Sequence, residues 1–519
     1  MFYTKFYIHL HNRLFVALIH QNFRIQITKK SLETPNKLTS LKMNSTSQKL
    51  SVKEKIGYSL GDLAANLVFQ TLMTYLAYFY TDIYGLSPAH SSIIMLVVGL
   101  IAAFIFNPII GAIADRTNSK WGKFRPWILW TAVPLGVIAL LAFTTPNFSY
   151  QGKVIYAVVT YSLLLMLYAA NNLPYSALSG VITGDMSERN SLSSYRFVAV
   201  MFAQFFVQVF MLAIIKSAGN GDKAVGIEKV MTILAIVGTI MLLITFLTTK
   251  ERIVPKPEQK SSVKEDLGDL VKNKPWLIML TLTLLAFITL AMKGGSYVYY
   301  FENYVDKTQL AIFIQPILDL LSNIGMNPFG NDPISAGFGL FNAGGIIFMI
   351  VGITLSKNLA DKYGKRNVFQ LFLLISTFFI IAFYFFAPKS IALMFFSQIL
   401  HGFFYGITIP LLWAMIADVA DYSEWKTNRR ATAIIFSAMM VGLKAGLSIG
   451  GALTTSILGH FDYVPNSLIQ SESAINGIKL LISIFPAIPF LIGVGLLFFY
   501  EINKKMEVQI ESDLKQRRA

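Results

Sequence analysis

The chain of 519 residues contains no cysteine. Disulfide bonds, thiolate metal sites and catalytic thiols are therefore excluded, and the redox compartment cannot be inferred from cysteine usage. Charged residues are also scarce, at 14% of the chain, whereas a soluble domain carries about 25%. Hydrophobic residues reach 54%, and the charges lie in short runs between long apolar stretches. This composition predicts a membrane protein.

The net charge of +16 would fit nucleic-acid binding, but the Lys and Arg residues stand at the ends of apolar segments. Membrane topology explains this placement better, because basic residues accumulate in cytoplasmic loops. We therefore expect the lipid bilayer as a partner and no nucleic acid. We also expect a monomer without a cofactor or metal site.

Twelve apolar segments are each long enough to cross the bilayer as a helix, which takes about 20 residues. We predict them at 56–81, 91–114, 126–145, 154–179, 195–215, 230–249, 276–302, 336–356, 368–388, 391–417, 431–458 and 478–500. Lys and Arg gather in every second connection, beginning with the one after the second segment. Those loops and both termini are therefore expected in the cytoplasm of a multi-pass protein of the cell membrane.

A basic segment that contains Pro255 and Pro257, residues 250–275, divides the apolar segments into two sets of six. The loops that follow the second and eighth segments resemble each other, with Asp115-Arg116 in one and Asp361-Lys362 in the other. Parallel repeats of this kind are typical of major facilitator transporters, whose substrate site lies between the halves near mid-membrane. We predict an all-α membrane protein with an N-terminal extension (1–54), two six-helix bundles (55–249 and 276–502), a cytoplasmic linker (250–275) and a cytoplasmic tail (503–519).

The N-terminal extension contains one apolar run, Leu14–Ile19, which is too short to span a membrane and is not followed by a signal-peptide cleavage site. Met43 begins a more ordinary amino terminus. We interpret the preceding residues as lying upstream of the true start, and a disordered basic tail is the alternative.

Polar residues inside the predicted spans are candidates for transport, because facing lipid is costly for them. Asp62, Asn66 and Gln70 recur at every fourth position, so they form a stripe along one helix face that suits hydroxyl-rich ligands. Contact between helices is the alternative for this stripe. Lys444 lies in the middle of the eleventh span, where a cavity or an ion pair would accommodate it.

Several further positions in the spans are weaker candidates for substrate binding. Lys293 precedes two glycines that could form a bend, although its ammonium could also reach the membrane surface. Asn171 and Asn172 stand before a proline that frees a backbone carbonyl, and a simple kink is the alternative. Trp413 is a candidate stacking platform for a sugar ring, as are Tyr58, Tyr168 and Tyr299, although most aromatic side chains pack in the core.

Four stretches of sequence together resemble the glycoside–pentoside–hexuronide:cation symporters over roughly residues 55–505. They are GYSLGDLAAN (57–66), YTDIYGL (80–86), WGKFRP (121–126) and IADVADYSE (416–424). The resemblance implies a carrier that moves a sugar or glycoside together with sodium or a proton. It also implies binding roles for Asn66, Asn172, Arg196 and Lys444, although positive-inside topology alone would also explain Arg196.

The chain departs from the family at the positions of its coupling carboxylates. Ala103, Asn107 and Asn172 stand where the resemblance leads us to expect acidic residues. Asparagine can coordinate a cation but cannot titrate, so we hypothesise that sodium coupling is weakened or absent and that the cavity favours hexuronides or acidic oligosaccharides. Asp62 and Glu302 are the nearby carboxylates that could replace the missing acids.

Charged loop residues are expected to form a cytoplasmic gate that exchanges partners between two states. These residues are Asp115, Arg116, Asp361, Lys362, Asp418, Asp421 and Arg429. A solvated loop surface is the alternative. The long stretch 306–333 contains an amphipathic segment, for which we favour an interfacial helix over an external lid.

The main function predicted from the sequence is secondary active sugar transport. An uncoupled sugar facilitator, a sugar sensor and a lipid transporter remain open. A membrane enzyme is disfavoured, because the sequence offers no extramembrane catalytic domain.

Overall fold

The computed structural model describes residues 49–253, 268, 270–330, 332–427, 432–467 and 469–518. Helices dominate this part of the chain, and the described residues contain no strand. The predictions about Met43, Pro255 and Pro257 fall outside these residues. The all-α membrane fold predicted from the hydropathy pattern is confirmed.

In the N-terminal half, the described residues form eight α-helices. They are α2 (Val52–Tyr78), α3 (Pro88–Ile101), α4 (Asn107–Arg116), α5 (Arg125–Leu141), α6 (Tyr150–Ile182), α7 (Met186–Val209), α8 (Met211–Ala218) and α9 (Lys223–Thr248). Two π-helical turns continue this set: η1 (Phe79–Ile83) extends α2, and η2 (Ala102–Phe106) joins α3 to α4.

The C-terminal half follows the linker. Its helices are α11 (Lys274–Asn303), α12 (Lys307–Asn323), α13 (Pro333–Tyr363), α14 (Lys365–Ala382) with the 3₁₀ turn η3 (Phe383–Phe385), α15 (Ile391–Thr427), α16 (Thr432–His460), α17 (Glu472–Ile482), α18 (Ile484–Leu497) and α19 (Lys504–Arg518). The predicted tail, 503–519, thus contains a helix.

Each of the twelve predicted spans coincides with one of these helices or with consecutive helices. Ten helical segments among the described residues are long and apolar enough to cross a membrane. α5 is apolar but has only 17 residues, and α2 carries Glu54 and Asp62 among its apolar residues and is not among the ten. The count of twelve therefore exceeds the number of helices that meet these criteria.

Capping side chains explain where several helices begin. Ser51 accepts a hydrogen bond from the backbone N–H of Glu54 at the start of α2, and Asp185 caps α7 in the same way. An oxygen at this position satisfies an N–H that has no partner within the helix. α2 accordingly begins at Val52, three residues before the predicted start of the first bundle.

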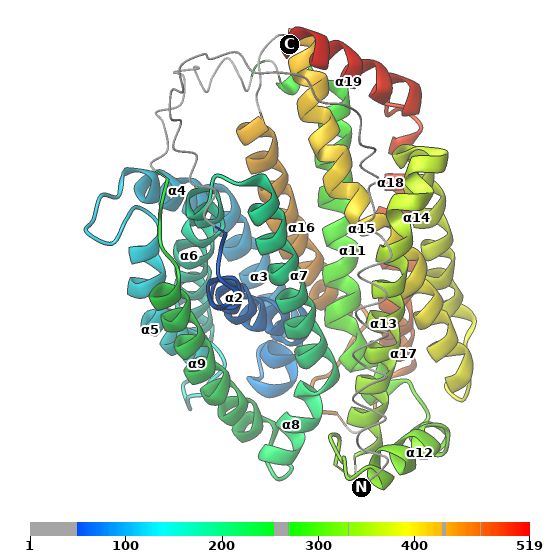
Figure 1. Cartoon of the computed structure of the whole chain (residues 1–519). Coiled ribbons are helices and arrows are strands. Elements are labelled where there is room, and N and C mark those ends of the chain that lie inside the picture. The colour runs from blue at the N-terminus through cyan, green and yellow to red at the C-terminus, as the bar shows by residue number, and fades with distance from the viewer. Residues whose placement is uncertain are drawn as a thin grey trace, which may run out of the picture. The chain divides into compact units, whose positions relative to one another are not determined.

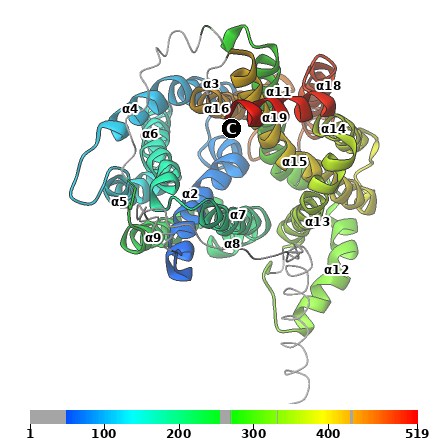
Figure 2. The same cartoon turned by 45° about the horizontal axis from the view of Figure 1, so that its top comes forward.

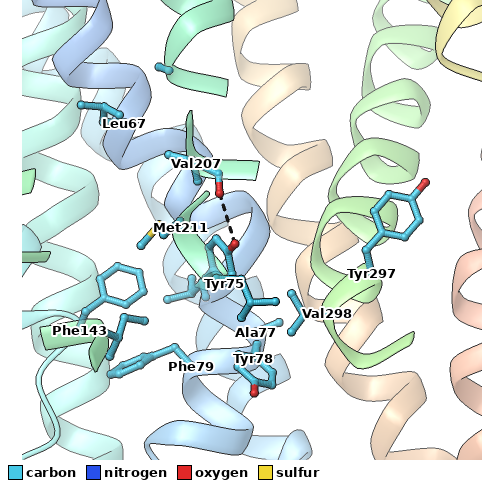
Figure 3. Close-up of a cluster of buried hydrophobic side chains, with 14 of the residues drawn as sticks. Leu67, Tyr75, Ala77, Tyr78, Phe79, Phe143, Val207, Met211, Tyr297 and Val298 are labelled. Atoms are coloured by element: carbon cyan, nitrogen blue, oxygen red, sulfur yellow. Dashed lines mark hydrogen bonds between the residues drawn. The ribbon is translucent and has the colours of Figure 1, made fainter. Parts of the chain in front are cut away.

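Two predicted spans are interrupted. The span 195–215 breaks at Phe210, between α7 and α8, and this leaves backbone carbonyls of α7 exposed to partners from other helices. The Tyr75 hydroxyl of α2 donates to the Val207 carbonyl oxygen at 3.3 Å, and Asn342 of α13 donates to the Gln208 carbonyl at 3.2 Å. Figure 3 shows the first of these contacts inside the apolar cluster around α2. Side chains of both halves therefore donate hydrogen bonds to carbonyl oxygens at the break.

The last span is divided at Ser483, between α17 and α18. Pro486 follows three residues later, and its ring cannot donate a backbone hydrogen bond to the preceding turn. The Pro486 carbonyl oxygen accepts a hydrogen bond from the Thr289 hydroxyl of α11 at 2.8 Å.

The helix pairs that join the two halves include α2 with α11 and α16, α3 with α16, and α7 and α8 with α13. Figures 1 and 2 show the blue-to-green helices of the first half beside the green-to-red helices of the second. At one end of the long helices α19 lies crosswise, and at the other end lies α12 (Figure 1). We call these the α19 end and the α12 end.

Glycines bring α13 and α15 into close contact. A Cβ atom added at Gly406 would lie 2.1 Å from the Met349 carbonyl oxygen, and one at Gly402 would lie 2.3 Å from the Gly345 carbonyl oxygen. Small residues allow helix backbones to approach in this way in membrane proteins.

We expect the substitution Gly406→Ala to lower the free energy of unfolding by about 1–3 kcal/mol, because the backbone atoms that it meets cannot move aside cheaply. Thermal unfolding in detergent measures the effect. Gly495→Ala is the matched control, since nothing lies within 4 Å of its added Cβ. Equal unfolding temperatures for both variants and the native protein would contradict the packing argument.

Candidate functional site

A cavity of about 320 Å³ lies between the two halves, at the middle turns of α2 and α11. We call it the central cavity. One wall comes from α2 and α7, and the other from α11, α13 and α15. This position agrees with the expected place of a substrate site between two repeats.

Four amide side chains stand on the first wall. Asn66 and Gln70 come from α2, and Gln204 and Gln208 come from α7. The Gln208 Nε2 atom donates to Gln70 Oε1 at 3.2 Å. Each amide offers both donors and acceptors, so this wall can form hydrogen bonds with hydroxyl groups. The structure thus brings two residues of the predicted stripe to one cavity wall.

Asp62, the third residue of the stripe, lies beside the cavity and is 5% exposed. Its Oδ2 atom accepts a hydrogen bond from Arg196 Nε at 2.8 Å, and its Oδ1 accepts one from Asn66 Nδ2 at 3.2 Å. The Arg196 guanidinium also lies 5.2 Å from the ring centre of Tyr175 and 5.7 Å from that of Tyr58. Asp62 and Arg196 therefore form an ion pair between α2 and α7, next to Asn66.

The second wall carries a buried ammonium. Lys293 of α11 lines the cavity and is 5% exposed. Its Nζ atom lies 5.5 Å from the ring centre of Tyr297, and among the described residues no carboxylate lies within ion-pair distance of it. The Tyr297 hydroxyl donates to Gln398 Oε1 at 2.9 Å, while His401 Nδ1 lies 2.9 Å from the Ser376 hydroxyl.

Lys444 lines a second cavity of about 100 Å³, which lies between α2, α3 and α6 of the first half and α11 and α16 of the second. Its Nζ atom donates to Asn107 Oδ1 at 2.7 Å. Tyr168 also lines this cavity, together with apolar side chains such as Leu165, and Ala103 is buried nearby on η2. The predicted lysine and one altered coupling position are therefore in direct contact across the halves.

Three predicted site residues lie away from both cavities. Asn171 is 1% exposed and donates to the Thr131 hydroxyl of α5 at 2.7 Å, so its amide is engaged within the first half. Asn172 is half-buried on the same helix, and Trp413 packs against the apolar cluster of the second half. These three side chains line neither cavity, and their binding roles stay predictions.

At the α12 end, charged residues of both halves form a network. The Glu302 carboxylate of α11 lies 3.5 Å from Lys216 Nζ and 3.1 Å from Lys223 Nζ, and it accepts a hydrogen bond from the Tyr78 hydroxyl at 2.7 Å. Lys216 also pairs with Asp332 at 2.9 Å. Partial burial alone would raise the pKa of the Asp332 carboxyl, but hydrogen bonds from neighbours including Lys216 hold it below its ordinary value.

A second contact joins the halves at this end. Asp82 of η1 accepts hydrogen bonds from the Tyr463 hydroxyl at 2.7 Å and from the Asn466 backbone N–H at 3.3 Å. The Thr81 hydroxyl lies 2.7 Å from the Tyr299 hydroxyl. Glu302 was predicted only as a substitute coupling acid, and Asp82 was not predicted to act at all. Sequence reasoning could have singled out both carboxylates, because each stands at the end of a predicted span with a tyrosine two residues away on either side.

The loop charges at the α19 end were predicted to pair as a gate. Asp115 lies 3.1 Å from Lys123, and Asp418 lies 2.6 Å from Lys365. Both pairs stay within one half, and Arg116 is exposed. The ion pairs of Asp115 and Asp418 therefore do not join the halves.

The remaining gate residues lie around the tail helix. The backbone carbonyls of Asp361 and Lys362 accept hydrogen bonds from Lys504 Nζ of α19, and Asp421 lines a groove against this helix. Burial raises the pKa of the Glu507 carboxyl above its ordinary value. Arg429 lies outside the described residues.

Comparison with known proteins places this geometry in a family. A family model described as "MFS/sugar transport protein" matches residues 57–332 and 331–504. The Escherichia coli (strain K12) protein named "Inner membrane symporter YicJ" is 34% identical over 447 residues, which cover 86% of this chain and 91% of that protein. The "Isoprimeverose transporter" of Lactiplantibacillus pentosus is 30% identical over 90% of this chain and 92% of its own length.

Solved structures share the fold at low identity. A bacterial homologue of the lysosomal transporter Spinster, inward-facing and unoccupied, matches with a TM-score of 0.58 and 14% identity over 88% of this chain and 97% of its own. A mutant form of the nucleoside transporter NupG matches with a TM-score of 0.57 and 14% identity over 86% of this chain and all of its own. This chain is therefore a sugar transporter and not an enzyme, and it belongs to the glycoside–pentoside–hexuronide:cation symporter family of the major facilitator superfamily.

Proposed function

We propose that this protein is a secondary carrier that moves a sugar or glycoside across the cell membrane, with both termini in the cytoplasm. The observation that carries the proposal is the central cavity, where amides of one half face polar groups of the other. Hydroxyl groups of a sugar would replace their lost hydration with these hydrogen bonds. The printed names of relatives, among them a glucuronide carrier protein homologue and an isoprimeverose transporter, support a sugar-like substrate.

In the proposed orientation the α12 end faces outward. Ion pairs of Glu302 and Asp332 then close the outer end between the halves, whereas the pairs Asp115–Lys123 and Asp418–Lys365 at the cytoplasmic end each stay within one half. This pattern is the one expected of a carrier in an inward-open state, because rocking of two bundles exchanges contacts between the two ends. Tail helix α19 would move with the second half.

Cation coupling is the least supported part of the family pattern here. Lys444 donates to a neutral amide, Asn107, where the resemblance leads us to expect a carboxylate. A sodium ion beside this ammonium would be repelled and would find no negative ligand at Ala103 or Asn107. We therefore propose an uncoupled facilitator, or weak coupling, for the native protein.

Uptake of a labelled glycoside into proteoliposomes is expected to be the same with and without an inward sodium gradient. The substitution Asn107→Asp should introduce a sodium dependence, because it supplies the missing carboxylate oxygen next to the cavity. The double variant Asn107→Asp/Lys444→Gln, which lacks the competing ammonium, should respond more strongly. Uptake by the native protein that rises steeply with the sodium gradient would contradict the proposal.

A further inference from the structure

Lys293 differs from the other cations in the interior of the bundle. Arg196 pairs with Asp62, Lys216 pairs with Glu302, and Lys444 donates to Asn107. Lys293 has no such partner among the described residues, although only 5% of it is exposed. Burial of an ammonium without a counter-charge is unfavourable, so an anionic group that enters the cavity would be favoured at this point.

The direction of the side chain follows from the helix. Lys293 and Tyr297 are four residues apart, so they share one face of α11. Figure 3 shows Tyr297 on the side of α11 away from Val298, which faces α2. The hydroxyl of Tyr297 reaches Gln398 of α15. This face of α11 therefore turns toward α15, which lines the same cavity.

The carboxylates nearest to the cavity are not free to balance this charge. Asp62 is held by Arg196, and Glu302 is held by Lys216 and Lys223 at the α12 end. The other titratable groups on the same wall are His401, Tyr297 and Tyr405, none of which is anionic near neutral pH. The wall opposite offers only neutral amides. The charges of the described lining residues thus leave the cavity positive.

We propose that the central cavity binds a hydroxylated monoanion, with its carboxylate on Lys293 and its hydroxyl groups on the amides of Asn66, Gln70 and Gln208. The inference rests on the proposed transport function and deepens it by assigning the anion subsite. It assigns that subsite to Lys293 and not to Lys444, the lysine indicated by the family resemblance. The smaller cavity at Lys444 is mainly apolar, and its ammonium is already bonded.

The test compares two probes that differ only at C6, methyl β-glucuronide with a carboxylate and methyl β-glucoside with a hydroxymethyl group, by equilibrium binding to the purified protein in nanodiscs. The native protein should bind the uronide at least about tenfold more tightly, because hydrogen bonds to charged groups are stronger than neutral ones. Lys293→Gln should weaken uronide binding by about 10- to 100-fold and change glucoside binding by less than about threefold. Lys293→Arg, which keeps the charge, should retain the preference.

Lys357→Gln is the matched control, since it removes the same charge from an exposed position on α13. It should leave the ratio of the two affinities unchanged. Equal affinities in the native protein, equal losses for both probes in Lys293→Gln, or loss of the preference in Lys444→Gln alone would each overturn the assignment. Retained glucoside binding shows that the variant is folded, and Lys293→Arg tests the charge if Lys293→Gln does not fold.

The experiment distinguishes a failure of the anion subsite from a failure of the sugar-carrier proposal. Binding and uptake of the glucoside without a preference for the uronide overturns the anion subsite and leaves the sugar carrier intact. Absence of both binding and uptake for both probes overturns the carrier proposal for these sugars and the subsite with it.

Discussion

Replacing Arg196 by methionine is expected to lower the free energy of unfolding by about 3 kcal/mol, the lower end of the range for breaking a buried ion pair. The substitution leaves the Asp62 carboxylate buried between α2 and α7 without its cation. The lower end applies because the Arg196 side chain is 26% exposed, so water can reach part of the site. Thermal unfolding in detergent measures this loss.

The double variant Asp62→Asn/Arg196→Gln separates the cost of a lone charge from the loss of the pair. It removes both charges, so it should be more stable than Arg196→Met alone. Arg116→Met is the matched control on an exposed residue and should change stability by less than about 0.5 kcal/mol. If Arg196→Met unfolds at the native temperature, or the double variant is as unstable as the single one, the ion pair does not stabilise the first half.

Neutralising Glu302 is expected to open the α12 end. In Glu302→Gln the ammonium groups of Lys216 and Lys223 lose their shared carboxylate on the other half, which weakens the closed arrangement. Because the chain has no cysteine, Met73→Cys provides a single reporter on the cavity wall. Its labelling by an impermeant thiol reagent from the outer side should rise by about 5- to 150-fold, the usual range for a coupled two-state shift.

The control for this experiment is Glu228→Gln, which removes a carboxylate from an exposed position on α9. It should leave labelling of Met73→Cys at the level of the native background. Unchanged labelling in Glu302→Gln, or equal labelling in both variants, would show that the network of Glu302 does not hold the outer end closed.

The helices could be predicted from the sequence because hydropathy depends on local composition. Each apolar segment coincides with helical structure, and the polar stripe at Asn66 and Gln70 follows from the helix period alone. The breaks at Phe210 and Ser483 were not predictable in this way. The carbonyls freed at Phe210 are satisfied by Tyr75 and Asn342, which are remote in sequence.

The pairing of charges was harder to predict than the position of each charge. The loop residues Asp115 and Asp418 were expected to belong to a gate that exchanges partners, and the sequence did not show that their partners here, Lys123 and Lys365, lie in their own halves. The contacts that do cross, such as Glu302 with Lys223, join residues far apart in the chain. Likewise, the amide of Asn171 faces α5 because of how α5 and α6 pack, and a single helix does not reveal that packing.

The central claim is that sugar binds in the cavity between the halves and crosses the membrane unchanged. Counterflow in proteoliposomes tests it most directly: vesicles loaded with unlabelled methyl glycosides receive a trace of the labelled sugar outside. The account predicts transient accumulation of the intact labelled sugar, which is lost in the double variant Asn66→Leu/Gln70→Leu. Binding without accumulation, or recovery of a chemically altered sugar, would contradict it.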